Sequence, residues 1–275
     1  SGAAKLWDIP ACGLKRTLRG HKERISGVAF HPTNPVESDL PCLATGSADL
    51  TIKLWNGAGN AVQTLIGHTE RVARVAFHPS GRFIGSASFD RSFRLWDVVA
   101  QREILLQEGH SRGVYGVAFQ CDGSLAATVG LDCIARIWDL RTGHNVATFT
   151  GHVKQILDVD WSPNGIHLAT ASDDHSVKIW DMRKRKCFYT IPAHSSLVST
   201  VKYDPTGKFI VSSSYDHTVK IWNTANNNFG LVKVLAGHED KVMGVAWSPD
   251  GDYIASTAYD RTWKLWARDA TATQE

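Results

Sequence analysis

The sequence predicts an all-β protein in which one four-stranded unit is repeated along the chain. A Trp returns at intervals of 41 to 48 residues, three of which are 42, and short apolar runs alternate with turn residues between successive Trp positions. The stretch Gly67–Asp97 contains one whole unit, which starts with Gly-His and ends with Trp-Asp. A repeat of this length decides the architecture of a chain, so it is the first signal to interpret.

Four side chains recur at fixed spacing within the repeat: a His, a hydroxyl, an Asp and a Trp. The Asp stands six residues before the Trp, and the hydroxyl stands four residues before the Asp. The His precedes the Asp by 22 residues in five copies and by 28 in the first. The six predicted tetrads are His21, Thr45, Asp49, Trp55; His68, Ser86, Asp90, Trp96; His110, Thr128, Asp132, Trp138; His152, Thr170, Asp174, Trp180; His194, Ser212, Asp216, Trp222; and His238, Ser256, Asp260, Trp266.

The chemistry of these four types favours a buried hydrogen-bond network. A carboxylate accepts an imidazole N–H, the other ring nitrogen bonds the hydroxyl, and the hydroxyl accepts the indole N–H. Six copies at one spacing are typical of a repeated structural part, so we interpret the His-Asp pairs as structural and not as catalytic dyads.

Four strands per repeat at this period indicate a WD40 β-propeller. The first strand of each repeat is apolar, as in Val75-Ala76-Phe77, and in four repeats a Pro-x-Gly turn follows it, for example Pro79-Ser80-Gly81. Pro presets the turn and Gly accepts a positive φ. The Asp follows the second strand in a tight turn, and the third strand ends at the Trp.

The repeat boundaries predict a single propeller domain over residues 1–267 and a loose polar tail at 268–275. We expect that the chain is cut from something longer or begins in mid-blade, so that 1–19 is a partial first blade containing only its third and fourth strands. We therefore expect a seven-bladed type with the first blade truncated; the alternative is six-bladed closure, in which Leu14–Leu18 completes the last blade. Full repeats are expected at 20–56, 67–97, 109–139, 151–181, 193–223 and 237–267.

Composition places the chain among soluble globular proteins, with 43% hydrophobic and 21% charged residues in a length of 275. No apolar run approaches the roughly 20 residues of a membrane span. Five cysteines without a C-x-x-C pair suggest neither a disulfide framework nor a zinc site. The net charge of +3 permits contact with nucleic acid but does not demand it.

Catalytic motifs are missing from the sequence. It contains no G-x-x-x-x-G-K-[ST], H-E-x-x-H or G-x-S-x-G pattern. Six of the twelve His belong to the tetrads, and the others are scattered without the spacing of metal ligands. We therefore predict no catalytic residue, no cofactor and no metal, and a protein that is not an enzyme.

The loops at one end of each repeat are the expected interaction surface. They combine Arg with aromatic residues, the composition of a protein-binding hot spot. The alternative interpretation is that each of these side chains is an ordinary loop residue without a binding role. A Lys or Arg also stands two residues before every repeat Trp. Its aliphatic stem is expected to cover apolar surface while its charge reaches solvent; the alternative is that these residues together form an RNA-binding ring. The candidate partner-binding residues are Arg71, Phe89, Arg91, Arg112, Tyr215, Lys241, Tyr259 and Arg261.

Several stretches outside the tetrads resemble one family over nearly the whole chain. They include Gly67–Phe83, Gln107–Phe119, Tyr189–His194 and Leu235–Gly244, and Ala193-His194 in place of Gly-His is part of the likeness. The family is the WD40 subunit of the spliceosomal U4/U6 small nuclear ribonucleoprotein, the pre-mRNA-processing factor 4 family. It carries an additional region ahead of its propeller.

The resemblance implies a nuclear, non-catalytic scaffold of the U4/U6 particle and the tri-snRNP, acting in pre-mRNA splicing. Its implied partners are pre-mRNA-processing factor 3 and a cyclophilin. U4/U6 RNA is reached either through such proteins or directly, and neither a membrane nor a small-molecule substrate is expected. The alternative is a peptide-reading WD40 adaptor, such as a ubiquitin-ligase substrate receptor or a histone reader.

Overall fold

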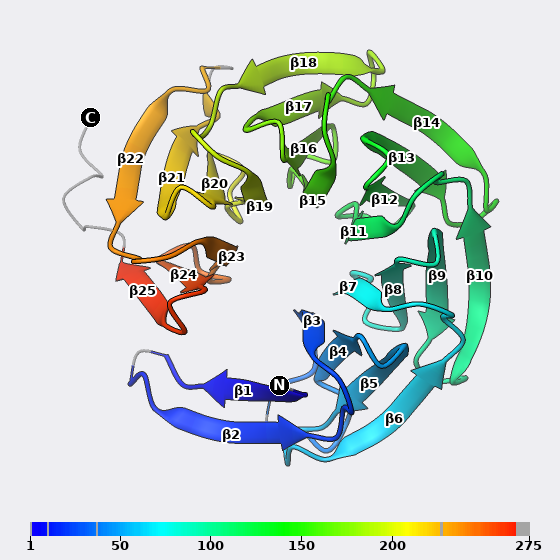
Figure 1. Cartoon of the computed structure of the whole chain (residues 1–275). Helices are drawn as coiled ribbons and strands as arrows, with labels where there is room; N and C mark the ends of the chain where they lie inside the picture. Colours follow the sequence, from blue (N-terminus) through cyan, green and yellow to red (C-terminus); the bar gives the residue numbers. More distant parts are fainter. Residues whose placement is uncertain (1, 10, 37, 226–227, 268–275) are drawn as a thin grey trace. The chain divides into compact units, whose positions relative to one another are not determined.

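The computed structural model describes residues 2–9, 11–36, 38–225 and 228–267, which form antiparallel sheets from β1 to β25 (Figure 1). The predicted tail at 268–275 lies outside the described residues. The chain divides into two compact units. Unit 1 comprises Ser1–Phe119, Gly123–Asp132 and Trp138–Asn145, and unit 2 comprises Gln120–Asp122, Cys133–Ile137 and Val146–Glu275.

Unit 1 starts with a two-stranded sheet and continues with four-stranded sheets in chain order. The two-stranded sheet pairs β1 (Ala3–Trp7) with β2 (Leu14–Arg19). The next sheet contains β3 (Ile25–Phe30), β4 (Leu43–Ser47), β5 (Thr51–Trp55) and β6 (Ala61–Ile66). It is followed by β7 (Val72–Phe77), β8 (Phe83–Ser88), β9 (Ser92–Asp97) and β10 (Arg102–Glu108).

The following sheet contains residues of both units: β11 (Val114–Phe119), β12 (Leu125–Gly130), β13 (Ile134–Asp139) and β14 (Asn145–Thr150). Unit 2 then forms a sheet of β15 (Ile156–Trp161), β16 (His167–Ser172), β17 (Val177–Asp181) and β18 (Lys186–Ile191). Its next sheet contains β19 (Val198–Tyr203), β20 (Phe209–Ser214), β21 (Thr218–Asn223) and β22 (Leu231–Ala236). The last sheet has three strands, β23 (Val242–Trp247), β24 (Tyr253–Ala258) and β25 (Trp263–Ala267).

These sheets confirm an all-β propeller fold with six blades, one for each full repeat. The described residues contain no complete seventh blade, because residues 3–19 supply only the two strands β1 and β2. The blade count therefore matches the six-bladed alternative and not the seven-bladed expectation. The strand proposed to complete the last blade, Leu14–Leu18, instead forms most of β2 and pairs with β1.

The turn after the first strand also fits one blade against the previous one, as Gly81 illustrates. Gly81 has a φ of 73°, a conformation that side chains rarely adopt. A Cβ at this position would stand 2.3 Å from the His31 ring of the preceding blade. The imidazole of His31 lies edge-on to Phe77, with ring centroids 4.9 Å apart. The turn is therefore a packing element as well as a chain reversal.

Hydrophobic cores lie between successive sheets of the same unit. In unit 1, one cluster joins Ile52 and Leu54 of β5 with Ile84 of β8, and the next joins Phe93 of β9 with Val114 of β11. In unit 2, similar clusters join β17 with β20 and β20 with β23. At about 25 cal/mol per Å² of apolar surface, this face-to-face burial is the main stabilising term for both units.

Candidate protein-interaction surface

Each tetrad is a closed hydrogen-bond chain, as the second full blade illustrates. His68, just before β7, places Nδ1 2.7 Å from Asp90 Oδ2 and Nε2 2.7 Å from Ser86 Oγ. The Trp96 indole N–H donates to the same Ser86 Oγ at 2.8 Å. All three hydrogen bonds can therefore form at once, each with one donor and one acceptor: the indole donates to the hydroxyl, the hydroxyl donates to Nε2, and Nδ1–H donates to the carboxylate.

The same arrangement occurs in all six tetrads. The His–Asp, His–hydroxyl and Trp–hydroxyl distances in the other five lie between 2.7 and 3.0 Å. Every tetrad His is buried and every tetrad hydroxyl is fully buried. The structure thus brings together all 24 predicted tetrad residues: His21, Thr45, Asp49, Trp55, His68, Ser86, Asp90, Trp96, His110, Thr128, Asp132, Trp138, His152, Thr170, Asp174, Trp180, His194, Ser212, Asp216, Trp222, His238, Ser256, Asp260 and Trp266.

A further hydroxyl, two residues after the Asp, belongs to the same network and was missed from the sequence. Ser92 donates its backbone N–H and its hydroxyl to Asp90 Oδ1, at 3.0 and 2.6 Å. The spacing was visible in the sequence, since Thr or Ser occupies this position in every repeat except the third, where Ile134 stands. The other four are Thr51, Ser176, Thr218 and Thr262.

These donors control the ionisation of the tetrad carboxyls. Burial alone would raise the pKa of Asp49, but hydrogen bonds from Thr51, His21 and the Lys22 amide outweigh it and lower the pKa to about 2. The same balance lowers the pKa of Asp90 well below its usual range. Burial also lowers the pKa of His194, against the opposing effect of Asp216. Each such pair therefore holds an ionised carboxylate against its imidazole.

This chemistry is that of a structural lock. The polar atoms of each tetrad are already paired with one another, so none is left to attack or to protonate a substrate. Among the described residues, no group of three or more His, Cys, Asp or Glu side chains is arranged to hold a metal ion. The part of the chain that the structure describes also has no helix long and apolar enough to cross a membrane.

In unit 1, the candidate residues Arg71 and Phe89 form a stacked pair. The Arg71 guanidinium lies 3.6 Å from the centroid of the Phe89 ring, and the Phe89 N–H donates to the Arg71 carbonyl at 3.0 Å. Tyr115 of β11 lies edge-on to the same ring, with centroids 5.9 Å apart. Tyr115 was not predicted, because its partner comes from the neighbouring blade.

Gly113 provides the space for this contact between blades. A Cβ there would come 3.1 Å from both Cα and Cδ1 of Phe89. The equivalent position, three residues after the repeat His, holds a side chain in every other full repeat, for example Arg71 and Lys241. Alignment of the repeats would have shown this exception.

Arg91 and Arg112 lie in loops next to the stacked pair and are exposed. Arg91 follows the tetrad residue Asp90, and Arg112 immediately precedes Gly113. Neither arginine, nor Arg71, has an ion-pair partner within 4 Å among the residues the structure describes. We name Arg71, Phe89, Arg91, Arg112 and Tyr115 the basic–aromatic surface.

Unit 2 contains a smaller counterpart. The Lys241 ammonium lies 5.1 Å from the centroid of the Tyr215 ring, which repeats the Arg71–Phe89 pair with a weaker cation. Tyr259 is 57% exposed, and Arg261 beside it is also exposed. The structure therefore brings Tyr215 and Lys241 together.

Four of the basic residues that stand two positions before a repeat Trp bind groups of their own blade. Lys53 and Lys178 each donate to a Thr hydroxyl of the adjacent fourth strand at 2.9 Å, and Arg94 pairs with Glu103 at 2.6 Å. Lys220 donates to the Ala193 carbonyl at 2.8 Å. These contacts favour the structural interpretation over an RNA-binding ring.

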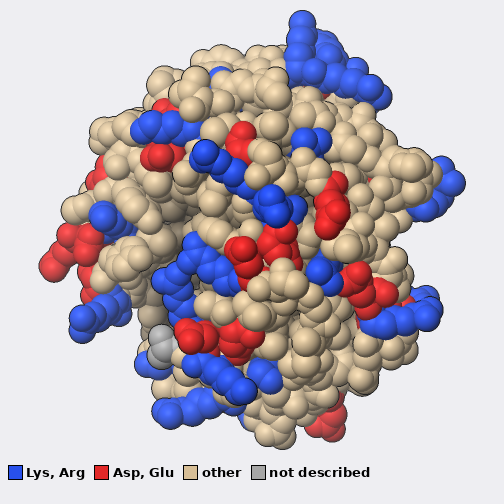
Figure 2. Space-filling view, turned by 45° about the vertical axis from the view of Figure 1, so that its right-hand side comes forward, with Lys and Arg blue, Asp and Glu red and all other residues tan. Residues whose placement is uncertain are grey.

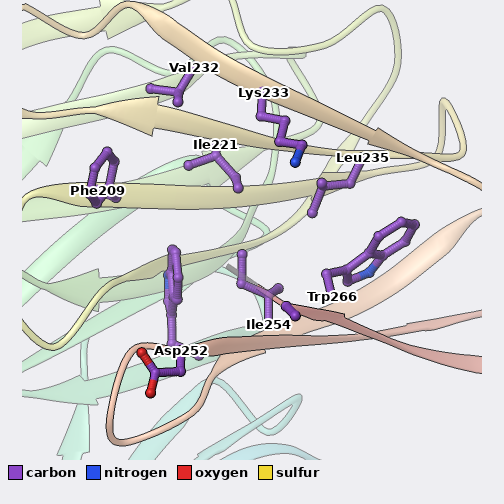
Figure 3. A pocket seen from close by; sticks show the side chains of 10 residues that line it. Phe209, Ile221, Val232, Lys233, Leu235, Asp252, Ile254 and Trp266 are labelled. Carbon is purple, nitrogen blue, oxygen red and sulfur yellow. The ribbon is translucent and has the colours of Figure 1, made fainter. Parts of the chain in front are cut away.

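Unit 2 also contains an apolar cavity of about 210 Å³ between β20–β22 and β24–β25. Figure 3 shows Phe209, Ile221, Ile254 and Trp266 around it. Its two charged residues, Lys233 and Asp252, come from opposite sides of the cavity. A cavity of this kind accepts an apolar side chain but offers no convergent polar groups for chemistry.

Comparison with known proteins agrees with the repeat. The model of the family "WD domain, G-beta repeat" matches residues 12–56, 59–97, 102–139, 143–181, 185–223 and 229–267. The chain belongs to the WD40-repeat family. WD40 propellers typically act as non-catalytic scaffolds for protein–protein interaction.

Segments of the chain are similar to individual proteins. The chain is 51% identical over 64 residues to the U4/U6 small nuclear ribonucleoprotein PRP4-like protein of Arabidopsis thaliana, covering 23% of this chain and 10% of that protein. It is 52% identical over 39 residues to human U4/U6 small nuclear ribonucleoprotein Prp4, covering 14% of this chain and 8% of that one. It is 33% identical over 78 residues to the nuclear distribution protein PAC1 of Gibberella zeae, covering 28% and 16%.

These matches correct one expectation. The likeness to the pre-mRNA-processing factor 4 family was expected over nearly the whole chain, but the matched segments cover at most 23% of it. They support a relation within the WD40-repeat family and not a close resemblance along the chain. Each match also spans only 8–16% of the relative's own length.

Proposed function

We propose that this WD40 protein is a non-catalytic scaffold of the U4/U6 small nuclear ribonucleoprotein and the tri-snRNP, acting in pre-mRNA splicing in the nucleus. Its partners would be other proteins of that particle, with pre-mRNA-processing factor 3 and a cyclophilin as those the resemblance implies. Contact with U4/U6 RNA would pass through these proteins.

The observation that carries the proposal is the identity of 51–52% to two U4/U6 small nuclear ribonucleoprotein subunits. The shorter of these segments, 39 residues, is about the length of one blade. Tetrad positions alone supply only four residues per blade, so identity at this level extends to residues that the repeat does not require. The match to PAC1 is longer, but its identity of 33% is closer to what a shared repeat pattern explains.

The geometry supports a scaffold in a second way. The tetrads stabilise each blade from within, and the exposed loops present Arg, Lys and aromatic side chains, the residues that dominate protein interfaces. Figure 2 shows Lys and Arg interspersed with Asp and Glu on the face in view, a distribution that suits protein partners better than a nucleic-acid groove.

Affinity purification from nuclear extract tests this function. The tagged chain is the bait, proteins are identified by mass spectrometry, and U1, U2, U4 and U6 RNAs are measured by hybridisation. We expect U4 and U6 RNAs to be enriched over U1 and U2, together with the proteins of the U4/U6 particle. Protease treatment of the washed complex should release both RNAs, since proteins are expected to hold them.

The alternative functions give different outcomes. Recovery of ubiquitin-ligase subunits or histones, without U4 and U6, would favour the peptide-reading adaptor. Recovery of nuclear distribution proteins alone would favour the relation to PAC1. Either result would overturn the splicing proposal.

A further inference from the structure

We propose that the basic–aromatic surface of unit 1 binds an acidic segment of a partner protein. The inference deepens the proposed function, on which it rests for the identity of the partner but not for its chemistry. It assigns a ligand class to Arg71, Phe89, Arg91, Arg112 and Tyr115.

The centre of this surface is fixed in place before any partner binds. Phe89 is seated against the backbone of Gly113, where no Cβ separates the two chains. Tyr115 packs edge-on against its ring, and the backbone of Phe89 is tied to that of Arg71. Contacts from two blades therefore hold one aromatic ring, so little conformational entropy remains to be lost there on binding.

The Phe89 ring in turn orients Arg71. With its guanidinium carbon 3.6 Å from the ring centroid, Arg71 gains a cation–π contact and rests its apolar face on the aromatic face. Its N–H donors stay at the edge of the plane, where they can make a bidentate contact with a carboxylate. Arg71 is therefore already oriented for a bidentate ion pair with a carboxylate before the carboxylate binds.

The charges around the stacked pair are not neutralised within the protein. Among the described residues, Arg71, Arg91 and Arg112 have no ion pair, whereas Arg82 and Arg94 of the same unit pair with Asp97 and Glu103. The carboxylate of Asp90, which precedes Arg91 in the chain, is occupied by His68 and Ser92. Positive charge without an internal partner selects a negatively charged ligand.

The ligand that fits is a protein segment and not RNA. Single-stranded nucleic acid binds by stacking bases on open aromatic faces. Here one face of Phe89 is already covered by Arg71, and the ring also contacts Gly113 and Tyr115, so it is not a free stacking platform for a base. Asp or Glu carboxylates with intervening apolar residues match the arginines and the aromatic edges together.

Fluorescence anisotropy with the purified full chain tests the inference. The probes are a short fluorescein-labelled peptide of alternating Glu and Leu, a peptide of alternating Lys and Leu, and a single-stranded poly(U) RNA of the same length. We expect the Glu-Leu peptide to bind most tightly. Phe89→Leu, which keeps apolar volume but removes the ring, should weaken binding by several-fold, and Arg71→Glu/Arg91→Glu/Arg112→Glu by about ten-fold or more.

A control with the same change of charge is Arg102→Glu/Arg141→Glu/Arg183→Glu. These exposed arginines lie in or next to the turns between third and fourth strands, and the change should leave affinity for the Glu-Leu peptide within about two-fold. Equal loss in both triple variants would overturn the inference, because net charge alone would then explain binding. Preference for poly(U) would also overturn it. Neither result bears on recovery of U4 and U6 RNAs, so the two proposals fail separately.

Discussion

At the scale of single residues, the tetrad explains why four residue types recur together. Each member provides a hydrogen-bond partner for the next: Trp180 donates to Thr170, Thr170 bonds His152, and His152 donates to Asp174. The final acceptor, Asp174, also receives the Val153 amide and the Ser176 hydroxyl. Loss of one member leaves a buried partner without its bond, which costs more than the bond itself.

Two neighbouring aspartates of unit 2 provide a matched test. Asp174→Ala removes the acceptor of the buried His152 and should lower the free energy of unfolding by about 2–4 kcal/mol. The side chain of Asp173 is 32% exposed, and its Oδ2 lies 3.9 Å from Lys154 Nζ, at the outer limit of an ion pair. Asp173→Ala should therefore change the free energy of unfolding by no more than about 1 kcal/mol. Urea unfolding of both variants measures the difference. Similar losses would show that the tetrad carboxylate has no special role.

The lowered carboxyl pKa values predict acid sensitivity. A carboxyl whose folded pKa lies below its unfolded value, as the pKa of about 2 for Asp49 does, stabilises the native state above the unfolded pKa near 4. That contribution is lost as pH falls toward the folded value. Stability should therefore drop steeply between about pH 4 and pH 2.

Urea unfolding of the parent chain and of Asp174→Ala at several pH values checks this dependence. The variant lacks one such carboxyl, whose pKa is also lowered, and should lose less stability on acidification. A slope that is the same for both proteins would contradict the assignment.

The tetrads were fully predictable from the sequence because spacing identifies each member. Asp and Trp six residues apart, with a hydroxyl four residues before the Asp, are unambiguous when six copies are compared. The extra hydroxyl, such as Ser92, was missed because Ser and Thr are ordinary turn residues and one copy departs from the pattern. The repeat therefore specified the hydrogen-bond lock but not every donor to it.

At the scale of elements, the first strands of neighbouring blades in unit 2 are joined by charge. Lys202 of β19 lies 3.1 Å from Asp158 and 3.6 Å from Asp160, both on β15. Asp158 and Asp160 also accept the amides of Val201 and Tyr203. The single positive charge of Lys202 thus faces the two carboxylates of Asp158 and Asp160, so one negative charge between the two strands is incompletely balanced.

That imbalance predicts a stabilising substitution. Burial raises the pKa of Asp160 to about 6, despite the opposing charge of Lys202, so the ionised form is less favourable in the folded than in the unfolded state. Asp160→Asn keeps an acceptor for the Tyr203 amide and removes this penalty. Its gain in stability should grow from about pH 4 to pH 6 and then stay constant, reaching at most about 3 kcal/mol.

Thermal unfolding of Asp160→Asn and the parent chain between pH 4 and pH 8 checks this profile. Lys202→Met is the opposite control, because it leaves both carboxylates without their cation and should destabilise most at high pH. A gain for Asp160→Asn that is independent of pH would contradict the explanation.

Contacts between blades were the part that sequence reasoning could not supply. The spacing placed Phe89 in a turn but gave no reason for Tyr115 to meet it, because β8 and β11 belong to different repeats. Likewise, Asp160 and Lys202 appear in the sequence only as departures from Ala at one position of the first strand. Such departures are informative because the repeat itself does not require them.

At the scale of the whole molecule, the repeat decided the fold class but not the number of blades. Strand-like runs at 3–7 and 14–19 indicated part of another blade, and they do pair with each other. Two strands do not make a complete blade, however, and the structure shows six. Function was less predictable still, because tetrads specify stability whereas partners are selected by loop residues that differ between blades.

The tetrads hold the fold, and we propose that exposed loop side chains bind partners. We therefore expect surface changes to alter binding without altering stability. The most direct test combines the melting temperature with capture of U4/U6 proteins from nuclear extract, for Arg71→Glu/Arg91→Glu/Arg112→Glu and for the control Arg102→Glu/Arg141→Glu/Arg183→Glu. We expect both triple variants to melt within about 2 °C of the parent chain, and only the first to lose U4/U6 proteins. Undiminished capture by the first variant, or equal loss by both, would contradict the account.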